Sequence, residues 1–125
     1  MNMLVDTSVL IDVLRGDAKA AVVLREARML GPLHASEVTR LEVLAGMRPS
    51  EKEATCGLLA ILSWHPLDER IAEVAGELGR EWIPSNRGID SADLAIAATA
   101  VVLNAKLLTR NIKHFPMFRG LSAPY

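Results

Sequence analysis

Short apolar segments alternate with longer amphipathic segments along most of this chain. The apolar segments, typical of buried strands in parallel sheets, are residues 3–6, 33–35, 64–67 and 106–109. Apolar residues at helical spacing predict helices over residues 7–16, 18–30, 37–47, 49–61, 68–82 and 90–104. This alternation predicts an α/β fold, a three-layer α/β/α sandwich with a mainly parallel central sheet. Residues 110–125 are interrupted by proline and glycine and predict no clear element.

Polar residues at the segment boundaries indicate where helices begin and where a site is expected. The residues able to cap the helices are Thr7 or Ser8, Ser36, Asp68, and Asp90 or Ser91. Pro66 predicts that the third strand lies at an edge of the sheet or bends. Because ligands of parallel sheets bind beyond the carboxyl ends of the strands, polar residues that follow a strand are the first candidates for a site.

Length and composition limit the class of protein. We expect the 125 residues, 1–125, to form a single domain that buries about two-thirds of its unfolded surface. With 50% hydrophobic and 23% charged residues, intrinsic disorder is excluded. The apolar runs are much shorter than the ~20 residues that cross a membrane, and we expect no signal peptide. A lone cysteine, Cys56, forms no internal disulfide, so we expect the reducing cytoplasm. The net charge of −1 gives no general attraction for nucleic acid.

Two polar residues directly follow predicted strands. Asp6 ends the first apolar segment, and Asn111 comes just after the last one. Both positions lie at the carboxyl edge of a parallel sheet, where a site is expected. The ordinary alternatives are a helix cap or first-turn acid for Asp6, and turn residues for Thr109 and Asn111.

Glu42 lies in the middle of a predicted helix. It shares a stripe with the small residues Ala45 and Gly46, a face that we expect to be buried. A salt bridge is the structural alternative, but Arg40 and Arg48 are not three or four residues from it. A charged side chain on an expected core face is an informative exception.

Asp90 and Asp93 stand at the start of the last long helix. Asp93 shares a face with Ile96 and Ala97, which should point into the protein. An aspartate cap and an acidic first turn are also ordinary features of a helix start. Taken alone, this pair is explained by helix structure.

Asp6, Glu42, Asp93 and Asn111 together suggest a metal site. If these acids face one edge of the sheet, they repel one another and raise one another's pKa values unless a cation neutralises them. Oxygen ligands without cysteine or histidine favour Mg²⁺ or Mn²⁺. Such a pocket suits phosphodiester hydrolysis, in which one or two metal ions activate a water and stabilise charge on the departing oxygen.

Four segments of the chain carry a resemblance to a known family. The segments are residues 4–12, 36–46, 88–100 and 108–115, and in this order they resemble the motifs of a PIN domain. The chain length and the ending Thr109-Arg110-Asn111, followed by His114-Phe115, are most similar to VapC toxins of bacterial toxin–antitoxin pairs. The resemblance implies an Mg²⁺- or Mn²⁺-dependent endoribonuclease that inhibits translation by cutting tRNA or rRNA. It also implies a homodimer, and inhibition by a VapB-like antitoxin whose segment occupies the acidic cleft.

Site residues follow from the resemblance by position. Asp6, Glu42 and Asp93 match the three main acids, expected to bind the metal and to be catalytic. Asp90 matches an extra acid with the same role. Asn111 stands where the family often has an aspartate, and an amide carries no charge, so either Asp90 or Asn111 is expected to complete the site.

Hydroxyl groups are expected to support these acids. Thr7, Ser8 and Thr109 are the accessory residues that would orient Asp6 and bound waters. Asp12, further along the first helix, is interpreted as a solvated or capping residue.

Other classes of protein fit less well. A haloacid-dehalogenase-like phosphatase needs an aspartate where Ser8 stands, and no phosphate-binding P-loop motif is present. The main alternative is a non-catalytic PIN-like module that acts through its antitoxin complex on DNA. The presence of all four acids favours the enzyme.

Overall fold

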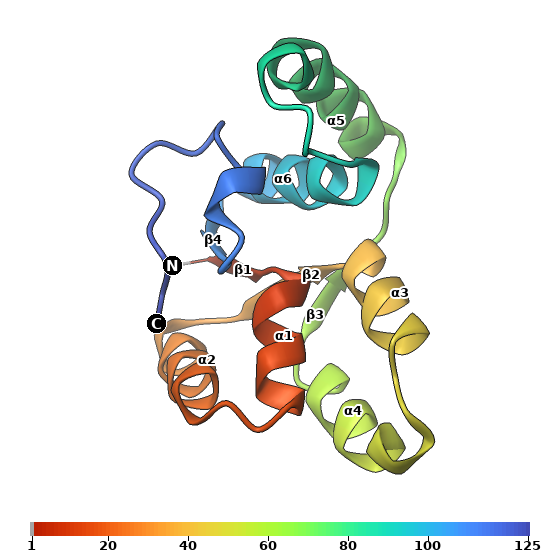
Figure 1. The fold of residues 1–125 in the computed structure, drawn as a ribbon, viewed down its shortest axis with the longest axis vertical. Coiled ribbons are helices and arrows are strands. Elements are labelled where there is room, and N and C mark those ends of the chain that lie inside the picture. The colour runs from red at the N-terminus through yellow and green to blue at the C-terminus, as the bar shows by residue number, and fades with distance from the viewer. Residues whose placement is uncertain (1) are drawn as a thin grey trace.

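A computed structural model describes residues 2–125, and within them four parallel strands form one sheet (Figure 1). The strands are β1 (Met3–Val5), β2 (Leu33–Ser36), β3 (Ser63–His65) and β4 (Lys106–Leu108), in the spatial order β3-β2-β1-β4. The helices are α1 (Thr7–Leu14), α2 (Ala18–Leu30), α3 (Glu37–Ala45), α4 (Lys52–Leu59), α5 (Glu69–Trp82) and α6 (Ser91–Leu103). Short 3₁₀ turns are η1 (Pro49–Glu51), η2 (Ile83–Ser85) and η3 (Ile112–His114). The predicted α/β/α architecture and parallel sheet are confirmed.

Helix caps follow the sequence prediction at three starts. A side-chain oxygen accepts a hydrogen bond from a first-turn backbone N–H at Ser36 for α3, Asp68 for α5 and Asp90 for α6. The first helix differs, because Asp6 rather than Thr7 or Ser8 occupies its N-cap and makes no capping bond with its side chain. The carboxylate of Asp6 is therefore available for other contacts.

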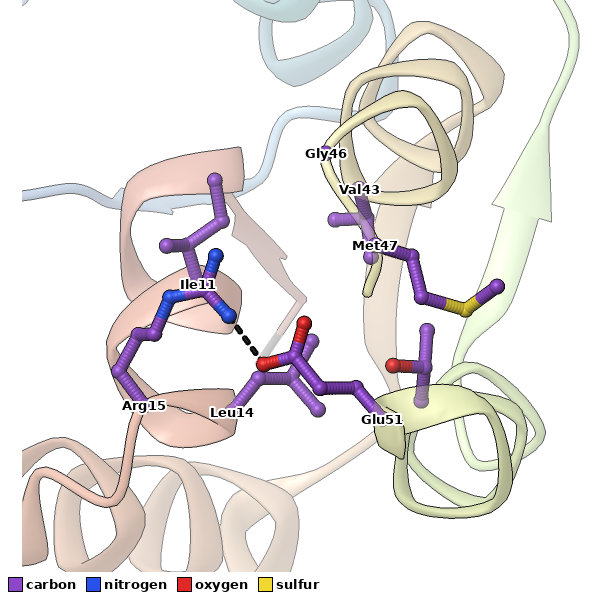
Figure 2. Close-up of a pocket in the computed structure, with 8 residues that line it drawn as sticks. Ile11, Leu14, Arg15, Val43, Gly46, Met47 and Glu51 are labelled. Atoms are coloured by element: carbon purple, nitrogen blue, oxygen red, sulfur yellow. Dashed lines mark hydrogen bonds and ion pairs between the residues drawn. The ribbon is translucent and has the colours of Figure 1, made fainter. Parts of the chain in front are cut away.

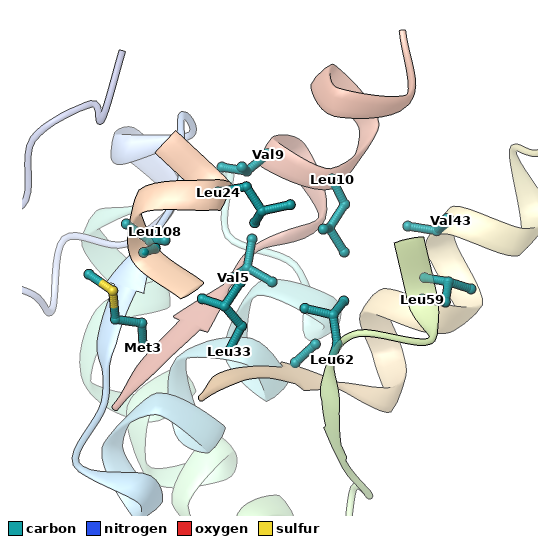
Figure 3. Close-up of a cluster of buried hydrophobic side chains, with 12 residues drawn as sticks. Met3, Val5, Val9, Leu10, Leu24, Leu33, Val43, Leu59, Leu62 and Leu108 are labelled. Carbon is teal, nitrogen blue, oxygen red and sulfur yellow. The ribbon is translucent and has the colours of Figure 1, made fainter. Parts of the chain in front are cut away.

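Alternation along the strands divides the core between the two faces of the sheet. Met3 and Val5 point to one face, where they pack with Leu10 of α1 and Leu24 of α2 (Figure 3). Leu4 points to the opposite face, against α6 and the segment that follows β4. Helices cover both faces, so the central strand β1 is buried along its whole length, whereas the edge strand β3 is only partly buried.

Helix α6 is the most deeply buried helix of the described chain. Residues 93–100 are all buried, because α6 lies between the sheet and α5 (Figure 1). A helix that is apolar on every side is stable only in such a position. The first turn of α6, which carries Asp93, is therefore held in a rigid layer.

Several local expectations are corrected. The predicted helix 49–61 is divided into η1 and α4, and α3 ends two residues before the predicted boundary. Cys56 is exposed. The segment 110–125, for which no element was predicted, contains η3, the buried Phe115 and a return of Tyr125 to α1. Pro66 follows β3, which lies at the edge of the sheet as predicted. Among residues 2–125, no helix has the length and apolarity that a membrane crossing requires.

Candidate active site

Asp6 lies at the carboxyl end of β1 and is 3% exposed. Its backbone N–H donates to the carbonyl of Leu108 on the neighbouring strand β4 (2.8 Å), which fixes it at this edge of the sheet. One carboxylate oxygen, Oδ2, accepts hydrogen bonds from the hydroxyls of Ser8 (2.8 Å) and Thr109 (2.7 Å). Asp6 does occupy the N-cap position of α1, as its helix-cap alternative predicts, but its side chain makes no capping hydrogen bond.

Two backbone amides orient these hydroxyls. The N–H of Arg110 donates to Ser8 Oγ (3.1 Å), and the N–H of Asn111 donates to Thr109 Oγ1 (2.9 Å). Each hydroxyl has a single proton, so a hydroxyl that accepts from an amide turns that proton toward Asp6. Asn111 contacts this network through its backbone, and the residue is exposed.

Glu42 is joined to the first turn of α1 by a hydroxyl. The Thr7 hydroxyl donates to Glu42 Oε1 (2.7 Å) and lies 3.0 Å from the Thr39 hydroxyl. The expectation that Glu42 lies on a buried face is wrong, because α3 buries Thr39 and Val43 instead and leaves Glu42 exposed. Thr7 follows Asp6 directly, so this bond holds the Glu42 carboxylate toward the same edge of the sheet.

Asp93 and Asp90 form a reciprocal cap at the start of α6. Asp90 Oδ1 accepts from the Asp93 N–H (2.8 Å), and Asp93 Oδ2 accepts from the Asp90 N–H (3.1 Å). The structural role expected for this pair is therefore present. Burial, reinforced by the nearby Asp90 carboxylate, raises the pKa of Asp93 to about 6, although the Asp90 N–H and His114 act in the opposite direction.

His114 is a member of this arrangement that sequence reasoning missed. Its Nδ1 lies 3.0 Å from Asp93 Oδ2, which joins η3 to the start of α6. The available signal was the position of His114 inside the fourth motif, residues 108–115, three residues after Asn111.

The acids of this edge have no arginine or lysine partner within residues 2–125. The arginine–carboxylate pairs of the described chain lie elsewhere and are Arg15–Glu51, Arg40–Glu37 and Arg110–Asp12. In the same part of the chain, no hydrogen bond reaches Oδ1 of Asp6 or of Asp93, while Oδ2 of each accepts two. Each of these carboxylates thus presents one fixed and one open oxygen.

The donor set suits a hard divalent cation, although it is not a complete cage. Within residues 2–125, no three histidine, cysteine, aspartate or glutamate side chains group closely enough to hold a metal ion. Hydroxyl groups hold individual carboxylates instead, Thr7 for Glu42 and Ser8 with Thr109 for Asp6. Mg²⁺ commonly uses one or two protein carboxylates and completes its shell with water and substrate oxygens, so its binding does not require a group of three carboxylates.

Two hollows lie beside α1. A groove of about 330 Å³ is lined by Ser8, Ile11, Asp12, Arg110 and Asn111, beside the hydroxyl partners of Asp6. A narrower apolar pocket lies between α1, α3 and α4, where the Arg15–Glu51 ion pair crosses it (Figure 2). Neither hollow is lined by the four predicted acids, but the groove contains two other residues predicted for the site, Ser8 and Asn111.

Comparison with known proteins identifies the family. The PIN domain model matches residues 3–117. The chain is 46% identical over 123 residues to Ribonuclease VapC19 of Mycobacterium tuberculosis, with 98% of both chains covered. It is 42% identical to Ribonuclease VapC10 of the same species, covering 98% of this chain and 92% of that protein. The chain therefore belongs to the PIN-domain family, as its four motifs predicted.

Solved structures agree with this assignment. A toxin–antitoxin complex from Klebsiella pneumoniae contains a chain that superimposes with a TM-score of 0.79 at 28% identity, covering 98% of both chains. VapBC-1 from nontypeable Haemophilus influenzae superimposes with a TM-score of 0.76 at 25% identity, covering 92% of this chain and 90% of that one. The relatives matched by sequence and by structure are thus VapC ribonucleases and members of toxin–antitoxin complexes.

Proposed function

We propose that this chain is a metal-dependent endoribonuclease, the toxin of a VapBC-type pair, which inhibits translation by cutting tRNA or rRNA. The observation that carries the proposal is the pair of buried aspartates, Asp6 and Asp93, each with one open oxygen and no arginine or lysine partner. The proposal is supported by relatives named ribonucleases at 46% and 42% identity over nearly the whole chain.

Asp6, Glu42 and Asp93 are the residues that would hold Mg²⁺ or Mn²⁺, with Asp90 or Asn111 completing the site. A bound divalent cation supplies positive charge beside a phosphodiester and increases the acidity of coordinated water. The hydroxyls of Ser8 and Thr109 keep the Asp6 carboxylate in one orientation, and Thr7 does the same for Glu42. The proposed carboxylate ligands are thus already oriented by hydrogen bonds before a metal ion or RNA binds.

The two candidates for the additional ligand differ in their present contacts. Asp90 uses Oδ1 to cap α6, which leaves Oδ2 for a second contact. Asn111 is exposed and lines the groove beside Ser8. Asp90 carries a charge and Asn111 does not, so we favour Asp90 where a second cation has to be balanced.

The proposed partners are a VapB-like antitoxin and a second copy of the chain. The antitoxin is supported by the solved relatives, a toxin–antitoxin complex from Klebsiella pneumoniae and VapBC-1 from nontypeable Haemophilus influenzae. We propose that an antitoxin segment covers the acidic edge, that the toxin acts as a homodimer, and that both act in the cytoplasm.

A digestion assay tests the function. Purified chain would be incubated with defined tRNA and rRNA fragments and Mg²⁺, with Asp93→Ala measured beside it. We expect cleavage by the wild type only, loss of cleavage in EDTA, and its return with Mn²⁺. Cleavage that persists in chelator, or equal cleavage by Asp93→Ala, would refute the proposal. An inactive wild type whose antitoxin complex binds DNA would favour the non-catalytic alternative.

A further inference from the structure

Arg110 connects the candidate site to a second cluster that the proposed chemistry does not use. Its Nη1 donates to Asp12 Oδ2 (3.1 Å), and its guanidinium carbon lies 5.0 Å from the centre of the Tyr125 ring. The Tyr125 hydroxyl donates to the same oxygen of Asp12 (2.6 Å). We call these three residues the Arg110 clasp. The expectation that Asp12 is merely solvated or capping is therefore wrong.

The clasp acts on the same helix face that orients Asp6. Ser8 and Asp12 are four residues apart in α1, so their side chains lie one above the other. Arg110 contacts both, with its backbone N–H on Ser8 and its side chain on Asp12. The segment after β4 is thus attached to α1 at two points. One of these points supports the hydroxyl that holds Asp6 Oδ2.

Tyr125 and Arg110 keep the protons that they donate to Asp12 over the pH range in which the proposed nuclease site acts. Burial, followed by the hydrogen bond to Asp12, raises the pKa of the Tyr125 phenol above its ordinary value. The hydrogen bond to Asp12 also raises the pKa of Arg110. Tyr125 therefore stays a donor and Arg110 stays charged, and Asp12 is the acceptor that both share.

We propose that the Arg110 clasp positions the Asp6 carboxylate and thereby sets the affinity of the site for a divalent cation; this rests on the proposed function. Without the clasp, residues 109–111 gain freedom and the amides of Arg110 and Asn111 no longer fix the hydroxyls of Ser8 and Thr109. The open oxygen of Asp6 then has to be ordered when the cation binds, which costs free energy. Asp12, Arg110 and Tyr125 are positioning residues, since their side chains act on Asp6 only through Ser8 and Thr109.

Binding of Mn²⁺ to the purified chain, measured by calorimetry at a temperature where every variant is folded, tests the clasp. We expect Asp12→Ala and Arg110→Gln to weaken Mn²⁺ binding by about tenfold, the range found for groups that support metal ligands. Tyr125→Phe, which keeps the ring, should cause a smaller loss. The double variant Asp12→Ala/Arg110→Gln should lose no more than either single variant, because both changes open the same contact.

Arg15→Ala is the matched control. It removes another arginine–carboxylate pair, the one between Arg15 at the C-cap of α1 and Glu51, which touches neither Ser8 nor Asp6. We expect its Mn²⁺ affinity to equal that of the wild type.

Two outcomes would overturn the inference, and they can be told apart. If Arg110→Gln and Tyr125→Phe bind Mn²⁺ as tightly as the wild type does, the clasp has only a structural role while the proposed function stands. If the wild type itself binds no Mn²⁺, the proposed function and the clasp both fail. The mild variants Arg110→Gln and Tyr125→Phe decide the matter even if Asp12→Ala does not fold.

Discussion

Nδ1 of His114 lies 3.0 Å from Oδ2 of Asp93, and this contact joins the turn after β4 to the first turn of α6. The same oxygen accepts the backbone N–H of Asp90 (3.1 Å). Asp93 is thus held from two directions while it is buried in the layer between the sheet and α5. Burial disfavours the charged form of the Asp93 carboxyl, so ionisation of Asp93 reduces the stability of the fold.

Asp93→Asn is expected to stabilise the metal-free protein at neutral pH. Burial raises the pKa of Asp93 from 3.8 to about 6, so the folded state binds more protons than the unfolded state between these values. The contribution of Asp93 to the free energy of unfolding is therefore fully present below pH 4 and is lost as the pH rises through about 6. At pH 7.5 the neutral amide should add about 1–2 kcal/mol to the free energy of unfolding. Urea unfolding in EDTA measures this.

The pH dependence makes this prediction specific. At pH 4 the wild-type carboxyl is already protonated, so the gain from Asp93→Asn should largely disappear. Cleavage of RNA should be lost at every pH. An equal gain at pH 4 and pH 7.5 would show that the charge on Asp93 is not the cause.

Asp6→Asn should abolish cleavage and leave the fold intact. The amide keeps an oxygen that accepts from Ser8 and Thr109, so the free energy of unfolding should fall by no more than about 1 kcal/mol, if it falls. The matched control is Asp17→Asn at the N-cap of α2, where asparagine caps equally well. Activity assays and thermal unfolding check both variants. Wild-type cleavage by Asp6→Asn would remove Asp6 from the site.

A histidine pair predicts acid sensitivity away from the site. His34 Nδ1 and His65 Nε2 lie 2.7 Å apart on β2 and β3. Burial, and then the charge of His65, lowers the pKa of His34 from 6.5, so the unfolded state binds more protons. The contribution of His34 to the free energy of unfolding is fully present above pH 6.5 and is lost as the pH falls. The free energy of unfolding of His34→Gln should decline less between pH 7.5 and 5.5, and an unchanged decline would contradict this.

The fold was predictable because each strand and helix carries its own signal. Continuous apolar runs gave the parallel strands, and Ser36, Asp68 and Asp90 marked three helix starts. Burial of individual side chains was less predictable. The stripe of Glu42 with Ala45 and Gly46 suggested a buried face, but packing turned α3 by one position toward Thr39 and Val43.

The contacts between distant segments were the part that sequence reasoning missed. His114 reaches Asp93, and Tyr125 reaches Asp12, across 21 and 113 positions of the chain. Neither contact has a periodic signal, because both come from the segment after β4, which holds only the short turn η3 and otherwise no regular element. The sequence therefore indicated which acids belong to the candidate site. The backbone amide and imidazole contacts that orient these acids became visible only in the structure.

The most direct test of the central account is where a paramagnetic cation binds. Mn²⁺ would be added at substoichiometric amounts to ¹⁵N-labelled chain, and broadening of backbone amide signals would be recorded for wild type and Asp6→Asn. The account predicts that signals of residues 6–8, 93 and 109–111 broaden first in the wild type and persist in Asp6→Asn. Broadening centred elsewhere, for example at His34 and His65, or equal broadening in both proteins, would contradict it.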